Sequence, residues 1–271
     1  MLEIVVLGSG SSGNAILVRD SREAILIDVG FSAKQITRRL SEAGTSWENI
    51  SAILLTHEHS DHTRGLRVLC SQREIPVYAN PLTAEAIRFQ QPELKAAWCY
   101  FSTGSDFKIG GYSIESFSVS HDASDPVGFT IRHAKGSIGI ATDLGFPTRV
   151  VAERLRDVNT LFLESNYDEK LLEQDERRPW STKQRISSRH GHLSNRSAAA
   201  LVADIMHPQL STIILGHFSK DCNCTDVATQ TFREVFSERN LQLPRIVCAS
   251  QDCPTPVIEV TAQLEIQPRL L

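Results

Sequence analysis

The 271-residue sequence has no long hydrophobic run. A transmembrane helix needs about 18 or more consecutive apolar residues, and no such stretch occurs. The N-terminus, MLEIVVLGSG, has an acidic residue where a secretory signal peptide would have basic ones. We therefore expect a soluble, cytoplasmic protein with no membrane partner.

Cysteines are few for a chain of this length. The six cysteines are scattered along the sequence, so reduced thiols are expected rather than disulfides. Cys222 and Cys224 are separated by one residue, and no second Cys/His pair of zinc-finger type accompanies them. A soft-metal site at this pair is therefore the less favoured interpretation.

Positive charge is also scarce, with 28 Lys and Arg residues against 32 Asp and Glu residues, a net charge of −4. Taken alone, this balance argues against a nucleic-acid partner. The distribution is uneven, however, because residues 177–196 contain six basic residues and no acidic one, leaving 22 basic and 32 acidic residues elsewhere. This basic run is either a solvated face or a phosphate-binding surface, and it surrounds His192.

A glycine motif near the N-terminus has the wrong context for dinucleotide binding. Gly8 to Gly13 matches G-x-G-x-x-G, and Asp28 follows where a ribose-binding acid would lie. That motif requires a helix after the glycines, whereas residues 14–18 and 23–28 have the composition of strands. The glycines are therefore interpreted as a loop between antiparallel strands.

Further along the chain, capping residues and apolar periodicity predict helices over 32–43, from 61 or 63 to 73, and over 81–89, 147–155, 193–205 and 225–239. Strands are predicted over 50–55, 76–79, 107–109, 112–119, 127–133, 137–142, 160–163, 212–215, 245–248 and 256–260. This order favours two packed sheets with helices outside. We expect one domain over 1–262 and a loosely ordered tail over 263–271.

A cluster of possible metal ligands follows the apolar strand that ends at Leu55, in the sequence THEHSDH. In extended backbone, His57 and His59 point the same way and can reach one metal, while Asp61 and His62 can reach a second as a helix begins. Chance occurrence of four such specified positions in this composition is on the order of 10⁻³ or below.

The H-x-H-x-D-H sequence after an apolar strand resembles the signature of the metallo-β-lactamase superfamily, whose α/β fold is a four-layer αββα sandwich. The resemblance extends to SVSHD, ATDLG and ILGHFS, which match a third histidine (His121), a bridging aspartate (Asp143) and a final histidine (His217). Asp28 matches a structural aspartate that supports the histidine loop. The resemblance implies two divalent metal ions, zinc or manganese: one held by His57, His59 and His121, the other by Asp61, His62 and His217, with Asp143 between them.

Two further residues favour phosphodiester hydrolysis. Glu164 in LESN and His192 in GHLSN are similar to motifs of tRNA-processing nucleases in the superfamily, where they are thought to form a proton-donating pair. In order, GSGSSGNA, LIDVG, THEHSDH, SHDASDPVGF, TDLG, LESN, PWSTKQRI, GHLSN and LGHFSK resemble the YycJ/WalJ subfamily, over about residues 3–240. Cys222 with Cys224, and Tyr167, depart from its pattern, and no room exists for the large inserted domain of RNase J-type members.

The subfamily resemblance implies a 5′-to-3′ DNA exonuclease. A hydroxide held by the two metals would attack the phosphorus, and Asp61 would act as a catalytic residue as well as a metal ligand. His192, oriented by Glu164, would protonate the leaving oxygen. The expected phosphate contacts are Arg178, Lys183, Arg185 and Arg189, with Trp180 stacking on a base. Ser12 and Asn14 in the glycine loop are expected to let a substrate phosphate approach.

Two other functions remain open from the residues. A thioester, lactone or cyclic-phosphate hydrolase would use the same metal ligands, because they do not choose the substrate. A DNA-binding regulatory protein with a vestigial site is the non-enzymatic alternative, and the complete set of ligands counts against it.

Overall fold

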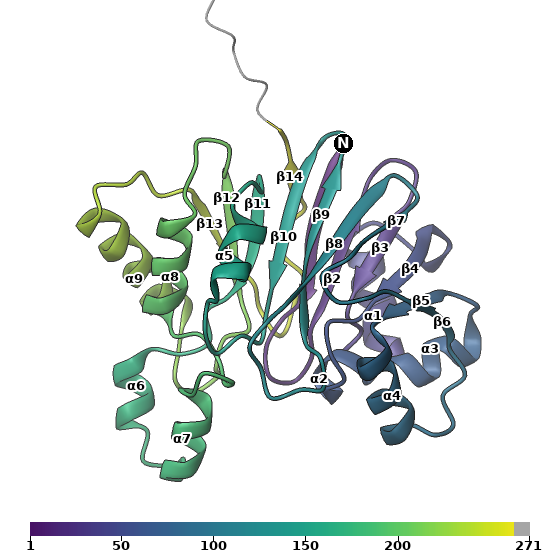
Figure 1. Ribbon diagram of the computed structural model, residues 1–271, viewed down its shortest axis with the longest axis horizontal. Helices are drawn as coiled ribbons and strands as arrows, with labels where there is room; N and C mark the ends of the chain where they lie inside the picture. The colour runs from purple at the N-terminus through teal and green to yellow at the C-terminus, as the bar shows by residue number, and fades with distance from the viewer. Residues whose placement is uncertain (263–271) are drawn as a thin grey trace, which may run out of the picture.

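The computed structural model describes residues 1–262, in which two seven-stranded sheets pack against each other (Figure 1). The first sheet has the order β14-β1-β2-β3-β4-β5-β6 and the second β13-β12-β11-β10-β9-β8-β7. The strands of the first are β1 (Leu2–Gly8), β2 (Ala15–Arg19), β3 (Ala24–Ile27), β4 (Ile50–Leu54), β5 (Pro76–Ala79), β6 (Ala97–Tyr100) and β14 (Ile258–Val260). Those of the second are β7 (Asp106–Ile109), β8 (Tyr112–Ser118), β9 (Val127–His133), β10 (Gly136–Ala141), β11 (Thr160–Glu164), β12 (Thr212–Gly216) and β13 (Arg245–Cys248). The expected tail over 263–271 lies outside the described residues.

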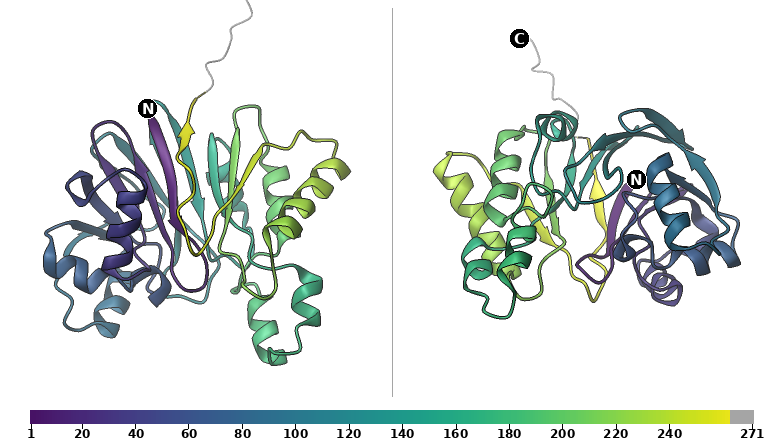
Figure 2. Two further views of the ribbon diagram at one scale, coloured as in Figure 1. Left: turned by 180° about the vertical axis from the view of Figure 1, so that it is seen from behind. Right: turned by 60° about the horizontal axis from the view of Figure 1, so that its bottom comes forward.

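Helices cover the outer face of each sheet (Figures 1 and 2). The first sheet packs against α1 (Ala33–Glu42), α3 (Leu66–Gln72) and α4 (Pro81–Gln90). The second packs against α5 (Arg149–Leu155), α8 (Asn195–Asp204) and α9 (Thr225–Glu238). The predicted αββα sandwich is therefore confirmed. Within residues 1–262, no helix has the length and apolar character needed to cross a membrane.

The glycine motif joins two antiparallel strands, as the sequence predicts. Strands β1, β2 and β3 pair antiparallel in succession, and Gly8 lies opposite Ala15 across the loop. The next strands, β4 and β5, run parallel to β3. Parallel pairing brings the carboxyl ends of neighbouring strands to the same edge, and this edge carries the polar loops.

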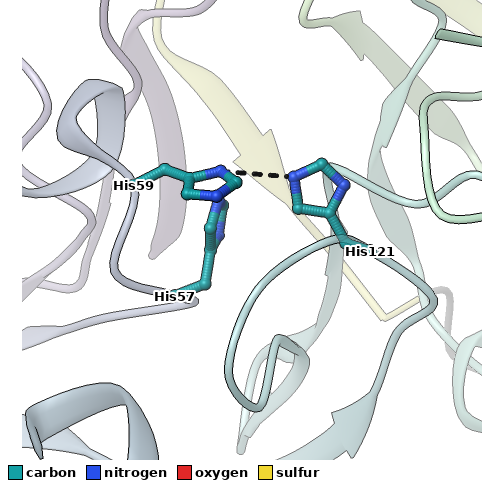
Figure 3. Close-up of side chains that lie close together, drawn as sticks. All are labelled: His57, His59 and His121. Atoms are coloured by element: carbon teal, nitrogen blue, oxygen red, sulfur yellow. Dashed lines mark hydrogen bonds between the residues drawn. The ribbon is translucent and has the colours of Figure 1, made fainter. Parts of the chain in front are cut away.

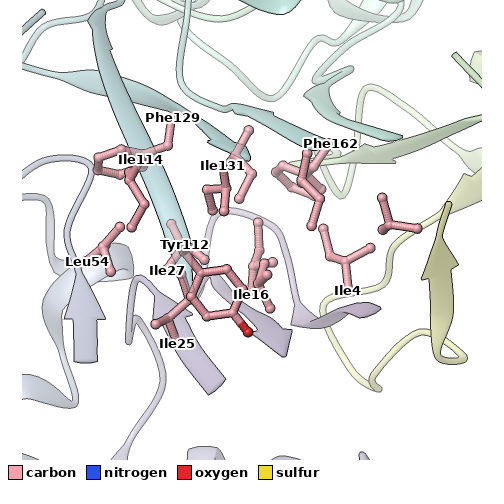
Figure 4. Packing of buried hydrophobic residues seen from close by; sticks show 14 of the residues in the cluster. Ile4, Ile16, Ile25, Ile27, Leu54, Tyr112, Ile114, Phe129, Ile131 and Phe162 are labelled. Atoms are coloured by element: carbon pink, nitrogen blue, oxygen red, sulfur yellow. The ribbon is translucent and has the colours of Figure 1, made fainter. Parts of the chain in front are cut away.

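Strand residues alternate between two hydrophobic layers. In β3, Ile25 and Ile27 pack into the core between the sheets, whereas Ala24 and Leu26 pack under the helices. Phe129 and Phe162 fill the same inter-sheet core from the second sheet (Figure 4). Because both faces are covered, the strand is a continuous apolar run rather than an alternating one.

One predicted helix is wrong, because the structure has two shorter helices in its place. The helix expected from 61 or 63 to 73 is two helices, α2 (Ser60–Thr63) and α3, separated at Arg64 and Gly65. The Gly65 N–H donates to Val29 O at 2.8 Å, and a Cβ at position 65 would lie 2.5 Å from Phe31 O. The two helices are therefore separate because the Gly65 N–H bonds to the 28–31 loop instead of to a carbonyl of α2.

Four short elements were not predicted: a 3₁₀ helix over Trp47–Asn49, β6, α6 (Glu169–Gln174) and α7 (Trp180–Ile186). α7 buries none of its side chains, so it lacks the apolar periodicity that identifies a helix in sequence. α6 and α7 project from the lower end of the molecule in Figure 1, the end at which α2 lies.

Candidate metal centre

The predicted ligands meet where four strands end. His57, His59, Asp61 and His62 follow β4, and the remaining three, His121, Asp143 and His217, follow β8, β10 and β12. The first set comes from the first sheet and the second set from the second sheet, so the cluster joins the edges of both sheets.

One group contains His57, His59 and His121, whose ligand atoms lie within 4.8 Å of one another (Figure 3). His59 Nδ1 is 3.4 Å from His121 Nε2. His121 Nδ1 lies 3.1 Å from Gly191 O, and His57 Nδ1 lies 3.0 Å from the Thr56 hydroxyl. These outer contacts engage Nδ1 and leave Nε2 of both residues toward the cluster.

A second group contains Asp61, His62 and His217. Asp61 Oδ2 lies 3.6 Å from His62 Nε2 and 3.7 Å from His217 Nε2. Asp143 lies between the two groups: Oδ1 is 3.5 Å from His217 Nε2 and 3.7 Å from His121 Nε2, and Oδ2 is 3.1 Å from His62 Nε2. The structure thus brings all seven predicted ligand residues together.

Asp28 contacts the histidine loop from behind. Its Oδ1 accepts the Thr56 N–H at 2.9 Å, and its Oδ2 lies 2.7 Å from His62 Nδ1. A carboxylate at this nitrogen fixes the imidazole tautomer and directs Nε2 to the cluster. The position of Asp28 agrees with the expected support of the histidine loop.

Two buried ring nitrogens in the cluster lack partners. His57 Nε2 and His217 Nε2 have no hydrogen bond within the described residues although both are buried. Such nitrogens are costly unless a ligand fills the space between them, and imidazole nitrogens with carboxylates are a donor set for zinc or manganese. These residues therefore fit a divalent metal.

Electrostatics also favour cation binding. Burial lowers the pKa of His57 well below its ordinary value, which keeps its imidazole neutral and able to ligate a metal. Burial opposes protonation of His62 and His217 as well, but neighbouring carboxylates, foremost Asp28 for His62 and Asp143 for His217, raise their pKa well above the ordinary value. A bound cation would displace these protons.

Glu164 connects the predicted proton donor to the ligands. Glu164 Oε1 lies 2.7 Å from His192 Nδ1 and 2.8 Å from His217 Nδ1, while Oε2 accepts the Leu144 N–H at 3.0 Å. Burial alone would lower the pKa of His192, but the Glu164 and Asp143 carboxylates raise it. The pairing of Glu164 with His192 was predicted, whereas the hydrogen bond between Glu164 and His217 was not.

The backbone at three site residues is strained. Asp28, Asp143 and His217 have positive φ angles of 61°, 50° and 56°, a conformation that costs on the order of 1–3 kcal/mol for a residue other than glycine. Gly30 permits the close approach of two loops, because a Cβ there would overlap Asp61 O. Asn14 N donates to the same oxygen at 2.8 Å.

The predicted phosphate contacts and the predicted stacking residue lie on or beside α7: Arg178, Trp180, Lys183, Arg185 and Arg189. Arg178 forms ion pairs with Asp175 and Asp221, and Arg185 pairs with Asp122 at 2.7 Å. Trp180 is 73% exposed. The positive charge of this run is therefore partly neutralised by one neighbouring carboxylate, Asp175, and by two that are distant in the sequence, Asp122 and Asp221.

The two predicted loop contacts differ in position. Ser12 is exposed, and its N–H is held by the Gln251 side chain at 2.8 Å. Asn14 is buried: its Oδ1 accepts the Ser9 hydroxyl, and its Nδ2 lies 3.1 Å from His62 Nε2. Asn14 therefore positions the loop and borders the cluster from within the protein.

Sequence reasoning missed two side chains that hold the ligand loops. Glu58, inside the H-x-H motif, accepts the Ser124 N–H and hydroxyl, both at 2.8 Å, and thereby holds the loop that carries His121. Asn166 Nδ2 donates to His217 O at 2.7 Å. The motif itself contained Glu58, but nothing in the local sequence indicates the distant partner.

A family model described as a beta-lactamase superfamily domain matches residues 23–218. The chain belongs to this superfamily and has the metallo-β-lactamase fold. It is 34% identical over 239 residues to exodeoxyribonuclease YycJ of Bacillus anthracis, covering 88% of this chain and 90% of that protein. It is 33% identical over 261 residues to exodeoxyribonuclease WalJ of Streptococcus pneumoniae, covering 94% and 97%.

Solved structures share the fold. The metallo-beta-lactamase fold protein YhfI of Bacillus subtilis superimposes with a TM-score of 0.75 at 15% identity, covering 96% of this chain and 100% of that one. The resemblance of the chain to the YycJ/WalJ subfamily, first drawn from its motifs, is confirmed over most of its length.

Proposed function

We propose that the protein is a metal-dependent exodeoxyribonuclease that shortens DNA from a 5′ end. The observation that carries this proposal is the His192–Glu164 pair beside the two groups of candidate ligands. Similarity over nearly the whole chain to relatives named exodeoxyribonucleases supports the same substrate class.

His57, His59 and His121 would hold one divalent ion, and Asp61, His62 and His217 a second, with Asp143 shared. Bound zinc or manganese would supply Lewis-acid stabilisation of the phosphate charge and lower the pKa of water. Asp28 and Glu164 orient the outer nitrogens of His62 and His217, which keeps their Nε2 atoms directed to the centre.

His192 acts as the proton donor in this proposal. Glu164 engages its Nδ1, so Nε2 is the nitrogen that delivers a proton to the leaving 3′ oxygen. General acid catalysis of this kind contributes about 10²–10⁴-fold to a rate. The 21% exposure of the His192 side chain gives substrate access to it.

The α6–α7 region supplies the proposed nucleic-acid contacts. Lys183, Arg185 and Arg189 are exposed or half-buried cations that would contact phosphates. Arg178 forms ion pairs with Asp175 and Asp221 beside them. Trp180 has an exposed ring that would stack on a base. A DNA substrate, together with six cysteines that are all unpaired, favours a cytoplasmic location.

The test uses DNA strands labelled at either end, single- and double-stranded, with manganese or zinc. We expect labelled mononucleotide to appear first from 5′-labelled DNA, and His192→Ala to lower kcat about 10²-fold or more. His190→Ala, an exposed histidine two positions away, is the matched control and should keep the rate. Turnover of a thioester without DNA cleavage by folded, metal-loaded protein would contradict the proposal.

A further inference from the structure

The loop after β10 carries an exposed aromatic ring close to the candidate metal centre. Phe146 lies three residues after Asp143, the residue between the two groups of ligands, and is 40% exposed. Single exposed apolar side chains are common on protein surfaces, so exposure alone gives Phe146 no function. Its position and its neighbours are more informative.

The backbone beside Phe146 contacts the loops of a candidate ligand and of the proposed proton donor. The Gly145 N–H donates to the carbonyl oxygen of the residue before His121 at 2.8 Å. A Cβ at position 145 would lie only 2.5 Å from Gly191 N, and Gly191 O lies 3.1 Å from His121 Nδ1. Gly191 directly precedes His192. Phe146 is therefore held at the edge of the centre where the leaving 3′ oxygen would be protonated.

A guanidinium lies over this ring. Arg189 Cζ is 4.4 Å from the centroid of Phe146, and the Arg189 carbonyl oxygen accepts the Ser120 hydroxyl at 2.8 Å, which holds the backbone in place. The other four arginines of residues 177–196 each pair with a carboxylate: Arg177, Arg178, Arg185 and Arg196. Within residues 1–262, the Arg189 guanidinium has an aromatic ring where the others have an acidic partner. A guanidinium that stacks by its face keeps its in-plane N–H groups available to a phosphate.

We propose that Phe146 and Arg189 form a stacking platform for a nucleobase next to the scissile phosphodiester bond. The inference rests on the proposed exonuclease function and adds base recognition at the metal centre itself. The base would extend the stack of ring and guanidinium, while the N–H groups of Arg189 donate to the adjoining phosphate. Every nucleobase has a π-face, so this platform positions DNA without regard to sequence. Phe146 is a positioning residue and takes no part in proton transfer.

The first test combines changes in the protein with changes in the substrate. Kinetics are measured on single-stranded DNA that is intact or has one abasic nucleotide at one of the first four positions from the 5′ end. Stacking predicts that Phe146→Ala raises KM about five- to hundredfold on the intact strand, with little change in kcat. An abasic nucleotide at position one or two, which the scissile bond joins, should abolish this difference between variant and parent. Phe146→Trp should keep the parent KM, and an equal effect of Phe146→Ala on every strand would overturn the proposal.

The contribution of Arg189 is tested by changing its shape at constant charge. Lysine keeps the positive charge but lacks the planar group that stacks on a ring. Arg189→Lys should therefore raise KM on the intact strand and have a smaller effect on the strand that is abasic at the position found for Phe146. Phe89→Ala removes an exposed ring on α4 and is the matched control, which should keep KM. An unchanged KM in Arg189→Lys would show that Arg189 provides charge alone and would contradict the platform.

The second test separates the platform from catalysis. Fluorescence anisotropy in the presence of EDTA measures binding to the full chain of an intact strand and of a strand that lacks the bases of its first two nucleotides. We expect the parent protein to bind the abasic strand roughly five- to hundredfold more weakly, and Phe146→Ala to bind both strands equally. This result without any DNA cleavage would support the platform and refute the exonuclease function. Cleavage by a parent protein that binds both strands equally would do the reverse.

Discussion

At the scale of single residues, one carboxylate oxygen of Glu164 serves two histidines with different tasks. His217 is a candidate metal ligand and His192 a candidate proton donor, and both direct Nδ1 at Oε1. The same side chain also accepts the N–H of Leu144, which follows Asp143. Its replacement should therefore disturb metal binding and proton transfer together.

We predict that Glu164→Gln lowers kcat about 10²-fold or more and also weakens metal affinity about 10–100-fold, because the amide lacks the negative charge beside the two imidazoles and would turn a donor NH₂ group toward the Leu144 N–H. His192→Ala should lower kcat alone. Metal content, measured by mass spectrometry of dialysed protein, separates the two variants. Glu153→Gln, exposed on α5, is the control that should change neither. Full metal content in Glu164→Gln would contradict the shared role.

Thiol reactivity provides a second prediction at this scale. Burial raises the pKa of the Cys70 thiol to about 11, so little thiolate forms below that pH. Cys224 and Cys253 are exposed. At mildly alkaline pH, iodoacetamide should label the two exposed cysteines first, and labelling of Cys70 should rise only as the pH approaches the raised pKa. Peptide mass spectrometry gives the order, and early labelling of Cys70 would refute the prediction.

At the scale of elements, the site depends on backbone segments that touch without intervening side chains. The loop after β3 contacts the glycine-motif loop through Gly30 N and Asn14 O, 2.9 Å apart, and contacts α2 and α3 through the backbone of Val29. These contacts fix the position of α2, and therefore the direction of the Asp61 and His62 side chains that it carries.

Gly30→Ala should therefore destabilise the fold by about 3 kcal/mol, because the added methyl overlaps Asp61 O and neither backbone can move without breaking hydrogen bonds. Gly44→Ala is the matched comparison. Its φ of 72° is unfavourable for alanine but no atom lies near the new methyl, so about 1 kcal/mol is expected. Urea unfolding of the two variants measures the difference, and equal losses would show that the crowding at Gly30 is relieved elsewhere.

The sequence predicted ligand identity better than ligand support. H-x-H-x-D-H was identified from its spacing after an apolar strand, and Asp143 and His217 from their resemblance to superfamily positions at strand ends; the structure brings these residues together. Glu58 contacts Ser124, and the Arg39 guanidinium donates to the carbonyl oxygen of Gln251. Both contacts join residues that are far apart in the chain. The local sequence pattern does not predict contacts between such distant residues. α7 was missed because a helix without buried residues has no apolar stripe.

At the scale of the whole molecule, the ligand cluster spans both sheets, with four ligand residues from the first and three from the second. The prediction of one domain over 1–262 stays a prediction, but the division of ligands means that neither sheet alone holds a complete set. A bound metal therefore favours the state in which the two sheets are packed together.

Metal removal should lower the thermal stability of the protein. At a free metal concentration about 100 times Kd, binding to the native state alone contributes about 2.7 kcal/mol, which corresponds to a Tm difference of about 5–10 °C for a chain of this size. Scanning fluorimetry with EDTA, and then with zinc or manganese restored, measures it. His57→Ala should show a much smaller response to EDTA, whereas an unchanged Tm in the parent protein would contradict metal binding at this edge.

The pairing of β14 with β1 has a consequence for synthesis of the chain. β14 contributes Ile258–Val260 to the same sheet as Leu2–Gly8, and the two strands pair antiparallel (Figure 2). The outer edge of β1, made first, thus has no partner until residue 260 has left the ribosome. During those seconds of elongation, β1 has free N–H and C=O groups that can pair with other nascent chains. Binding of a ribosome-associated chaperone to this strand would prevent such pairing.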